Sequence, residues 1–103
     1  MFPSNLVRQM KIQVRAAAHI AKIFDSRKTY IELPEPSTLG GLLNELTRIY
    51  GQEFYDAACT EDGYSPKHVA ILVNGSSAAA IGGVDIKLKD GDDVLFLPTI
   101  SGG

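Results

Sequence analysis

Alternating apolar and polar residues predict two strands near the start of the chain. One face of residues 10–16 carries only apolar side chains: Met10, Ile12, Val14 and Ala16. Residues 28–33 alternate again, with Ile31 and Leu33 in phase, and two prolines then end the run. Two strands at this spacing suggest a hairpin, and the connection between them is long enough to contain a helical turn.

Leucines at helical spacing predict one long helix between Thr38 and Gly51. Thr38 is placed as the N-cap, and Gly51 is placed to end the helix. The residues at three- and four-residue spacing form one buried face: Leu39, Leu42, Leu43, Leu46, Ile49 and Tyr50. Residues 52–68 are expected to form a connection anchored by Phe54 and Tyr55, with room for a short helix.

Two further strands follow in the second half of the chain. Residues 68–73, HVAILV, are apolar after His68 and predict a strand that ends at Asn74-Gly75, a strong turn signal. The pattern weakens over residues 76–89, where we expect at most a short edge strand, and Asp90-Gly91 turns the chain into a last strand over residues 93–97. The order predicts an α+β fold: a mixed sheet of four to five strands with one main helix packed on one face.

The last two long strands are apolar on both faces. We assign five residues to the core: Val69, Ile71, Val73, Val94 and Phe96. Four apolar residues then fall on the opposite face: Ala70, Leu72, Leu95 and Leu97. If they are contiguous, these residues predict a docking surface. The alternative is that the insert, residues 52–68, folds over them. The tail of small residues at the chain end favours the docking surface.

The chain ends in small residues after a proline. Pro98 ends the last strand, and residues 99–103, TISGG, reach on the order of 17 Å when extended, at about 3.3 to 3.6 Å per residue. Because the last two residues lack Cβ atoms, this arm can enter a narrow channel in a partner enzyme. The alternative is an ordinary frayed end. We therefore predict a flexible extension over 1–9, one domain over 10–98 and a flexible tail over 99–103.

Charge and composition exclude several classes of protein. The net charge is -2, and the Lys and Arg residues are spread along the sequence. The sequence therefore shows no basic cluster of the kind that binds nucleic acid. Cys59 is the only cysteine, and His19 and His68 match no metal-ligand spacing, so we expect neither a disulfide nor a metal site. No apolar stretch approaches the roughly 18 residues of a membrane span, and we expect a cytoplasmic protein.

Several segments together resemble a known family. They are ELPEPSTLGGLLNEL (32–46), the VNG turn (73–75), GGVDIKLKDGDDVLFLP (82–98) and the terminal Gly-Gly. They resemble the small subunit of molybdopterin synthase and the related sulfur carriers of thiamine biosynthesis. The resemblance implies a ubiquitin-like β-grasp fold with strand order 2-1-5-3-4. The family often has two prolines where this chain has Pro98-Thr99.

The resemblance also implies a chemistry for the chain end. A terminal carboxylate is ionised at neutral pH and is a poor electrophile, so it must be activated. In the family an E1-like enzyme uses ATP to adenylate the last glycine, and a sulfur donor then gives a thiocarboxylate. Here that site is Gly103, and Gly102 before it has no side chain to hinder its entry into the enzyme. Leu97 stands at the position of the family's exposed apolar residue before the tail, so the resemblance implies that it contacts the partner. We also expect partner contacts from residues of the apolar face and the tail: Leu72, Leu95, Pro98, Thr99, Ile100 and Ser101.

The implied partners are the E1-like adenylating enzyme, the large catalytic subunit of molybdopterin synthase and a sulfur donor. The carrier itself catalyses nothing and binds no cofactor, since the partner uses the ATP. Three alternatives remain at this point. A ubiquitin-like modifier would form an isopeptide bond through Gly103, a carrier could serve thiamine or another sulfur-containing metabolite, and a plain interaction domain would need no tail chemistry. Tungsten cofactor synthesis would use the same chemistry as the molybdenum branch.

Overall fold

The protein is represented by a computed structural model, which describes residues 8–61, 63–64 and 69–99. The strands are β1 (Gln9–Ala16), β2 (Lys28–Pro34), β3 (Ser37–Thr38), β4 (Cys59–Thr60), β5 (Gly63–Tyr64), β6 (Val69–Val73), β7 (Ser76–Ser77), β8 (Lys87–Leu88) and β9 (Asp93–Pro98). The helices are α1 (Ala18–Phe24), α2 (Leu39–Tyr50), α3 (Gln52–Ala58), α4 (Ala78–Ile81) and the 3-10 helix η2 (Gly83–Asp85).

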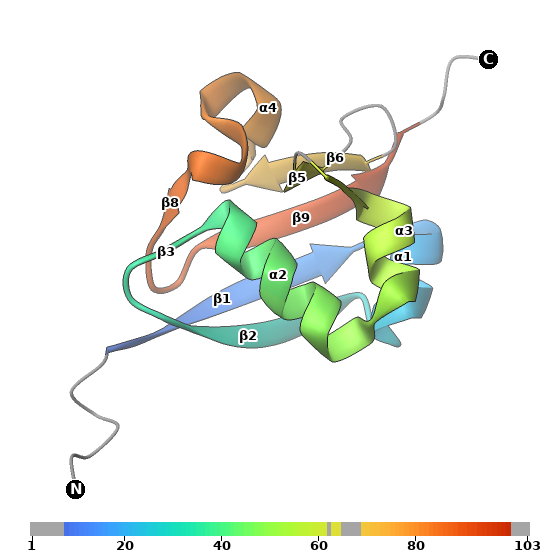
Figure 1. Cartoon of the computed structure of the whole chain (residues 1–103), viewed down its shortest axis with the longest axis horizontal. Coiled ribbons are helices and arrows are strands. Elements are labelled where there is room, and N and C mark those ends of the chain that lie inside the picture. Colours follow the sequence, from blue (N-terminus) through green and yellow to red (C-terminus); the bar gives the residue numbers. More distant parts are fainter. Residues whose placement is uncertain (1–7, 62, 65–68, 100–103) are drawn as a thin grey trace, which may run out of the picture.

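Five strands form one mixed sheet in the order β2-β1-β9-β6-β7. The central pair, β1 and β9, is parallel, and the other neighbours are antiparallel. Counted along the chain, these strands give the order 2-1-5-3-4, so the arrangement that the resemblance implied is confirmed. The α+β fold is also confirmed. Because of this pairing, the first and last strands of the described chain, β1 and β9, lie side by side at the centre of the sheet (Figure 1).

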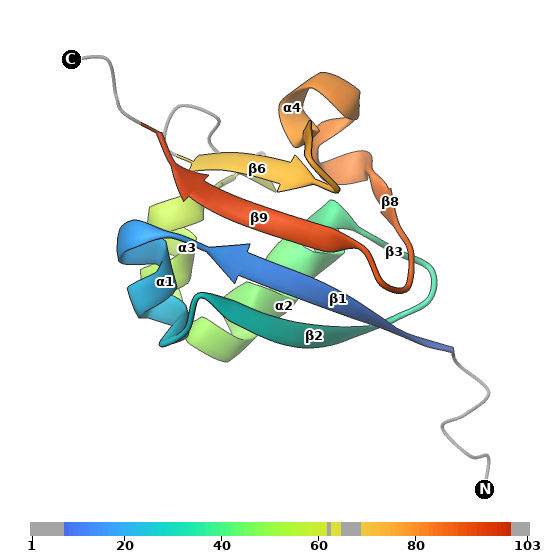
Figure 2. The ribbon, with the colours of Figure 1, turned by 180° about the vertical axis from the view of Figure 1, so that it is seen from behind.

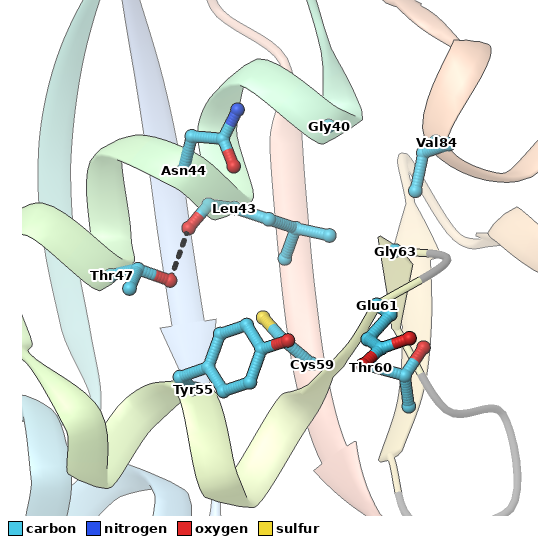
Figure 3. A pocket seen from close by; sticks show the side chains of 10 residues that line it. All are labelled: Gly40, Leu43, Asn44, Thr47, Tyr55, Cys59, Thr60, Glu61, Gly63 and Val84. Carbon is cyan, nitrogen blue, oxygen red and sulfur yellow. Dashed lines mark hydrogen bonds between the residues drawn. The ribbon is translucent and has the colours of Figure 1, made fainter.

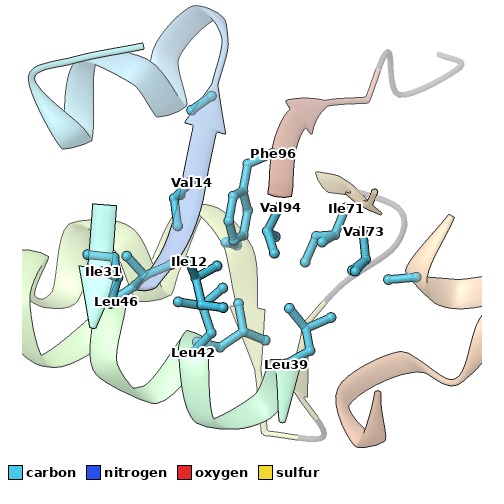
Figure 4. Close-up of a cluster of buried hydrophobic side chains, with 14 of the residues drawn as sticks. Ile12, Val14, Ile31, Leu39, Leu42, Leu46, Ile71, Val73, Val94 and Phe96 are labelled. Atoms are coloured by element: carbon cyan, nitrogen blue, oxygen red, sulfur yellow. The ribbon is translucent and has the colours of Figure 1, made fainter. Parts of the chain in front are cut away.

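Helices α1, α2 and α3 cover one face of the sheet, and the view from behind shows the other face without a covering helix (Figure 2). The alternation predicted for the strands is confirmed, because the in-phase residues of β1, β2, β6 and β9 are buried. Figure 4 shows β1, β6 and β9 directing their apolar side chains towards Leu39, Leu42 and Leu46 of α2. We call this the core face and the opposite one the outer face.

The long helix begins and ends where the sequence predicts. The Thr38 side chain accepts a hydrogen bond from the Gly41 amide at 3.2 Å, and Gly51 ends the helix with φ at 78°. The prediction that Ile49 is buried is wrong, since its exposed fraction is 44%. At roughly 100° per residue Ile49 lies at the rim of the leucine stripe, one turn past the last buried leucine. Tyr50 does pack inward, with its ring 4.8 Å from that of Phe24.

The two long connections become helices that extend the core. Phe24 of α1 and Phe54 of α3 lie 5.7 Å apart between ring centroids, and each meets Phe96 of β9 edge to face, at 6.0 and 5.8 Å. Aromatic pairs at such separations add about 0.5 to 1.5 kcal/mol beyond the burial of their area. The helices therefore fix the end of β9 from which residues 99–103 continue. Among the described residues, no helix is long and apolar enough to cross a bilayer.

Candidate functional site on the outer face of the sheet

The apolar residues of the outer face form one continuous group on β6 and β9. In the antiparallel ladder Leu72 lies opposite Leu95, and Ala70 lies opposite Leu97. Directly opposed residues on one face have Cβ atoms about 4.5 to 5.5 Å apart, so these four side chains are neighbours. All four are partly exposed, whereas the alternate residues of both strands are buried. We call the four residues the apolar strip.

The described part of the insert does not cover the apolar strip. Helix α3 lies on the core face, because its Phe54 is fully buried and contacts the inward-facing Phe96. Both views place α3 beside α1 and α2, on the far side of the sheet from the strip (Figures 1 and 2). The alternative that residues 52–61 fold over the outer face is therefore wrong, while residues 62 and 65–68 lie outside the described residues.

A polar border runs along the strip on the neighbouring strands. Arg15 of β1 is paired with Leu95 in the parallel ladder, and its guanidinium donates two hydrogen bonds to Asp93, at 2.8 and 2.7 Å. Gln13 donates to the same carboxylate at 2.8 Å and accepts from the Tyr30 hydroxyl at 3.2 Å. The hydrogen bond from Arg15 is the main cause that holds the pKa of Asp93 below its ordinary value, partly offset by burial.

Sequence reasoning missed this polar border as part of the site. Alternation places Gln13 and Arg15 on the polar face of the first strand, and this was the only sequence signal for the polar border. Their partner Asp93, which the sequence places at the start of the last strand, lies 78 to 80 residues further along the chain. Only the parallel pairing of β1 with β9 brings the three side chains together.

The end of the apolar strip is also the root of the tail. Pro98 pairs with Val69 at the last position of the β6 and β9 ladder, directly after the pair of Ala70 with Leu97. Phe96 accepts a hydrogen bond from the amide of Ala17 at 3.2 Å, which ties this end of β9 to the start of α1. Pro98 and Thr99 are partly exposed. The other predicted tail residues, Ile100, Ser101, Gly102 and Gly103, lie outside the described residues.

A cavity of about 390 Å³ lies on the core-face side, between α2, α3 and the β4–β5 hairpin. Figure 3 shows Cys59, Thr47 and Tyr55 among its lining residues. Burial raises the pKa of the Cys59 thiol, and a hydrogen bond with Thr47 lowers it only in part. Since the thiolate is the reactive form, this environment does not favour Cys59 as a sulfur relay. No group of three metal-ligating side chains occurs within the described part of the chain.

Comparisons with known proteins agree with this arrangement. Small archaeal modifier protein 3 of Haloferax volcanii is 28% identical over 94 residues, which cover 91% of this chain and 100% of that protein. The solution structure of a Haloferax volcanii protein superimposes with a TM-score of 0.82 at 25% identity, over 92% of this chain and 88% of that one. A putative molybdopterin converting factor subunit 1 from Pyrococcus furiosus gives a TM-score of 0.67 at 27% identity, over 88% and 99%.

The family match covers most of the domain and the whole tail. The model of the ThiS family matches residues 14–103, from the middle of β1 through the apolar strip to the terminal glycine. The relatives and the fold are those of small ubiquitin-like sulfur carriers and modifiers. This chain belongs to the ThiS family.

Proposed function

We propose that this chain is a sulfur carrier that serves as the small subunit of a molybdopterin synthase. An E1-like enzyme adenylates Gly103 at the expense of ATP, and a sulfur donor converts the adenylate to a thiocarboxylate. The observation that carries the proposal is the family match, which extends to Gly103 and includes the apolar strip at the root of the tail. The likeness to the putative molybdopterin converting factor subunit of Pyrococcus furiosus supports the molybdopterin branch over the thiamine branch.

The chemistry requires only the terminal carboxylate of this chain. One carboxylate oxygen of Gly103 attacks the α-phosphorus of ATP, and pyrophosphate leaves. A sulfur nucleophile then attacks the acyl carbon, and AMP departs with that oxygen. After reduction of any donor persulfide by a thiol, the terminus holds one sulfur in place of one oxygen. The thiocarboxylate sulfur then bonds to the pterin precursor on the large catalytic subunit. Water attacks the acyl carbon, the acyl carbon–sulfur bond breaks with the sulfur left on the pterin, and Gly103 regains its carboxylate.

The free energy of docking on the partner enzymes must offset the entropy cost of ordering the tail. Fixing the backbone of residues 99–103 in a channel costs about 1 to 2 kcal/mol per residue. Burial of the partly exposed Leu72, Leu95 and Leu97 returns about 25 cal/mol for each Å² of apolar surface removed from water. The strip begins where the tail begins, so one partner can engage both at once. In this proposal the strip supplies the affinity, and the tail supplies the reacting group.

The test is ATP–pyrophosphate exchange with the E1-like enzyme of the same organism. Deletion of Gly102 and Gly103, or addition of one residue after Gly103, should abolish exchange, because the reacting carboxylate is removed or displaced. Both variants should unfold at the wild-type temperature, since neither changes a residue of the hydrophobic core that the described part of the chain forms. One residue added before Met1 is the matched control and should leave exchange unchanged. Exchange retained by the form extended after Gly103 would contradict the proposal.

Protein modification is a second candidate, favoured by the likeness to small archaeal modifier protein 3 along its whole length. The same adenylate would then end as an isopeptide bond between Gly103 and a lysine of another protein. Mass spectrometry of cells that express an N-terminally tagged chain distinguishes the two candidates. A pure sulfur carrier gives only the free chain and its thiocarboxylate, whereas a modifier gives lysine peptides that carry the C-terminal residues of this chain.

A further inference from the structure

Strand β2 is the long open edge of the five-stranded sheet. The sheet ends in β2 on one side and in β7 on the other, and both views show β2 as the outermost strand on its side (Figures 1 and 2). An edge strand presents unpaired N–H and C=O groups to any strand that approaches it, and a short edge strand limits this exposure. β7 has two residues, whereas β2 has seven. The sheet can therefore accept a further strand beside β2.

The hydrogen bonds with β1 show which backbone groups of β2 face the open edge. In an antiparallel ladder, residue pairs that exchange hydrogen bonds alternate with pairs that do not. The amide of Ala16 donates to the carbonyl of Arg27 at 2.9 Å, one position before the start of β2. The amide of Glu35 donates to the carbonyl of Arg8 at 2.7 Å, one position after its end. The odd-numbered residues of β2 therefore bond to β1. The backbone polar groups at the open edge are those of Lys28, Tyr30, Glu32 and Pro34.

The chain itself closes both ends of this edge. At the start of β2, the hydroxyl of Ser26 accepts a hydrogen bond from the Lys28 amide at 3.1 Å and donates one to the Lys28 carbonyl at 2.6 Å. At the end of β2, the hydroxyl of Ser37 donates to the carbonyl of Pro34, and proline has no N–H to offer. Only the middle of the edge is then left to bind another strand.

Tyr30 and Glu32 supply the open middle of the edge. Within the described part of the chain, their backbone N–H and C=O groups make no hydrogen bond. We propose that β2 pairs antiparallel with β2 of a second copy of this chain, with Tyr30 opposite Glu32. Each of the two facing pairs exchanges two hydrogen bonds, so four bonds satisfy every open group of both copies. Ile31 then lies opposite itself on a two-fold axis, the symmetry of most homodimers.

The neighbouring registers fit this edge less well. A register with Tyr30 opposite itself would pair Lys28 with Glu32, but Ser26 already holds the backbone groups of Lys28. A register with Glu32 opposite itself would bring like charges face to face. It would also set Tyr30 against Pro34, which cannot donate a hydrogen bond. The register with Tyr30 opposite Glu32 is therefore the one that the open groups select.

The exposed side chains of β2 are also self-complementary. Lys28, Tyr30 and Glu32 lie on the outer face, and the exposed fraction of Tyr30 is 54%. In the proposed register Lys28 is a diagonal neighbour of Glu32 of the second copy, at about 7 to 8 Å, which long side chains can span. The charge of Lys28 also helps to lower the pKa of Asp93 in its own chain. The charge pair between copies therefore adds to the backbone bonds and does not replace them.

This dimer leaves the apolar strip free. β1 lies between β2 and β9, and the strip lies on β9 and β6. The two five-stranded sheets join into one continuous sheet, with the helices of both copies on the same face. One assembly thus carries two C-termini and two apolar strips. The dimer does not rest on the proposed function.

Sedimentation velocity and solvent-exchange NMR of the full chain test the dimer. Two paired residues per copy make a small interface, so we expect a weak dimer with a Kd of about 0.1 mM. At a total concentration of about ten times the Kd, mass action leaves about one fifth of the chains monomeric. The amides of Tyr30 and Glu32 should then exchange with solvent about five-fold more slowly than in the dilute chain. The exposed amide of Gly75, in the turn before β7, is the reference and should not change.

Glu32→Pro is the test variant, because it removes an amide at the open edge and leaves the bonds between β1 and β2 intact. Glu32→Ala is the matched control, since it loses the same carboxylate and keeps the amide. Glu32→Pro should raise the Kd about 10-fold or more, because two of the four hydrogen bonds are lost. Glu32→Ala should stay within about three-fold of the wild type. Thermal unfolding verifies the fold, and exchange in the wild type decides the matter if Glu32→Pro does not fold.

A chain that sediments as a monomer up to about 1 mM would overturn the proposal. Equal dimerisation of Glu32→Pro and Glu32→Ala would do the same, as would a dimer whose protected amides do not include those of Tyr30 and Glu32. A third result would assign the edge to a strand of another protein, against a second copy. In that result the two amides become protected when an extended peptide is added, while the chain stays monomeric.

Discussion

Asp93 is the residue that connects the polar border to the rest of the outer face. Its carboxylate accepts hydrogen bonds from Arg15 and Gln13 of β1, and its backbone amide donates to the side chain of Asn74 at 2.9 Å. These contacts tie β1, the first residue of β9 and the turn after β6 to one another. Because Arg15 is partly exposed, its ion pair with Asp93 is open to screening by salt.

The lowered pKa of Asp93 predicts a specific pH dependence of stability. A carboxyl group with a lowered pKa in the folded state stabilises the fold above its unfolded pKa, about 3.9, and loses that contribution as the pH falls through the folded pKa. Asp93→Asn should therefore reduce the loss of stability between about pH 5 and pH 2. Urea unfolding at several pH values measures the effect.

Arg15→Gln is the matched variant, because it removes the main cause of the shift and keeps a side chain of moderate length. It should reduce the same pH dependence, and the double variant should show no larger reduction than either single one. Additive reductions would show that the two side chains act independently, against the pair seen in the structure.

At the scale of the element, strand alternation in β9 separates the core residues from the residues of the proposed docking surface. Val94 and Phe96 are fully buried on the core face, while Leu95 and Leu97 are partly exposed on the outer face. The same strand is hydrogen-bonded on both sides, to β1 and to β6, and this fixes its register. A slip by one residue would exchange the two faces, so the core of aromatic rings also fixes the position of the apolar strip.

Substitutions at adjacent positions of β9 should therefore affect different properties, stability on the core face and binding on the outer face. Phe96→Ala should lower the free energy of unfolding by about 3 to 5 kcal/mol, because it empties a large core site between Phe24 and Phe54. Leu97→Asp should cost little stability and should weaken binding to the activating enzyme. Chemical unfolding and a binding titration measure the two effects. Unfolding by Leu97→Asp with a silent Phe96→Ala would mean that the two faces are reversed.

The sequence predicts the long elements well because their patterns are strong. The alternation in β1, β2, β6 and β9 and the leucine spacing of α2 each persist over five or more residues. Helices α1 and α3 have seven residues each and α4 has four, too few for a clear period. Helices α1 and α3 form because the tertiary core holds Phe24 and Phe54, and α4 buries Ala78. Strand order came from the family resemblance, since alternation does not encode which strands are neighbours.

The candidate site was predictable on β6 and β9 but not on β1 and β2. The adjacency of Leu72 with Leu95 follows from pairing two strands whose outer residues are apolar, and the structure confirms that they lie opposite each other. The cationic row formed by Lys28 and Arg15 needs both the antiparallel and the parallel register of β1. Side chains that meet only through the topology leave no local signal in the sequence.

At the scale of the whole molecule, the two faces of the sheet have different roles. Three helices cover the core face (Figures 1 and 2). The strand register places the apolar strip of the outer face beside Arg15 and Lys28. The strip ends at Pro98, where the tail begins. In the proposed function, the domain is a stable platform that positions a reacting C-terminus against its partners, and the comparisons show its membership of the ThiS family.

Intact-mass spectrometry tests the central claim, that Gly103 carries sulfur, most directly. The chain is incubated with the E1-like enzyme, ATP and a sulfur donor, and the Cys59→Ala variant is treated in parallel. The account predicts that both gain the mass of one sulfur exchanged for one oxygen, on the peptide that ends in Gly103, and that omission of ATP prevents the gain. A chain of unchanged mass, or a sulfur adduct that disappears in Cys59→Ala, would contradict the account.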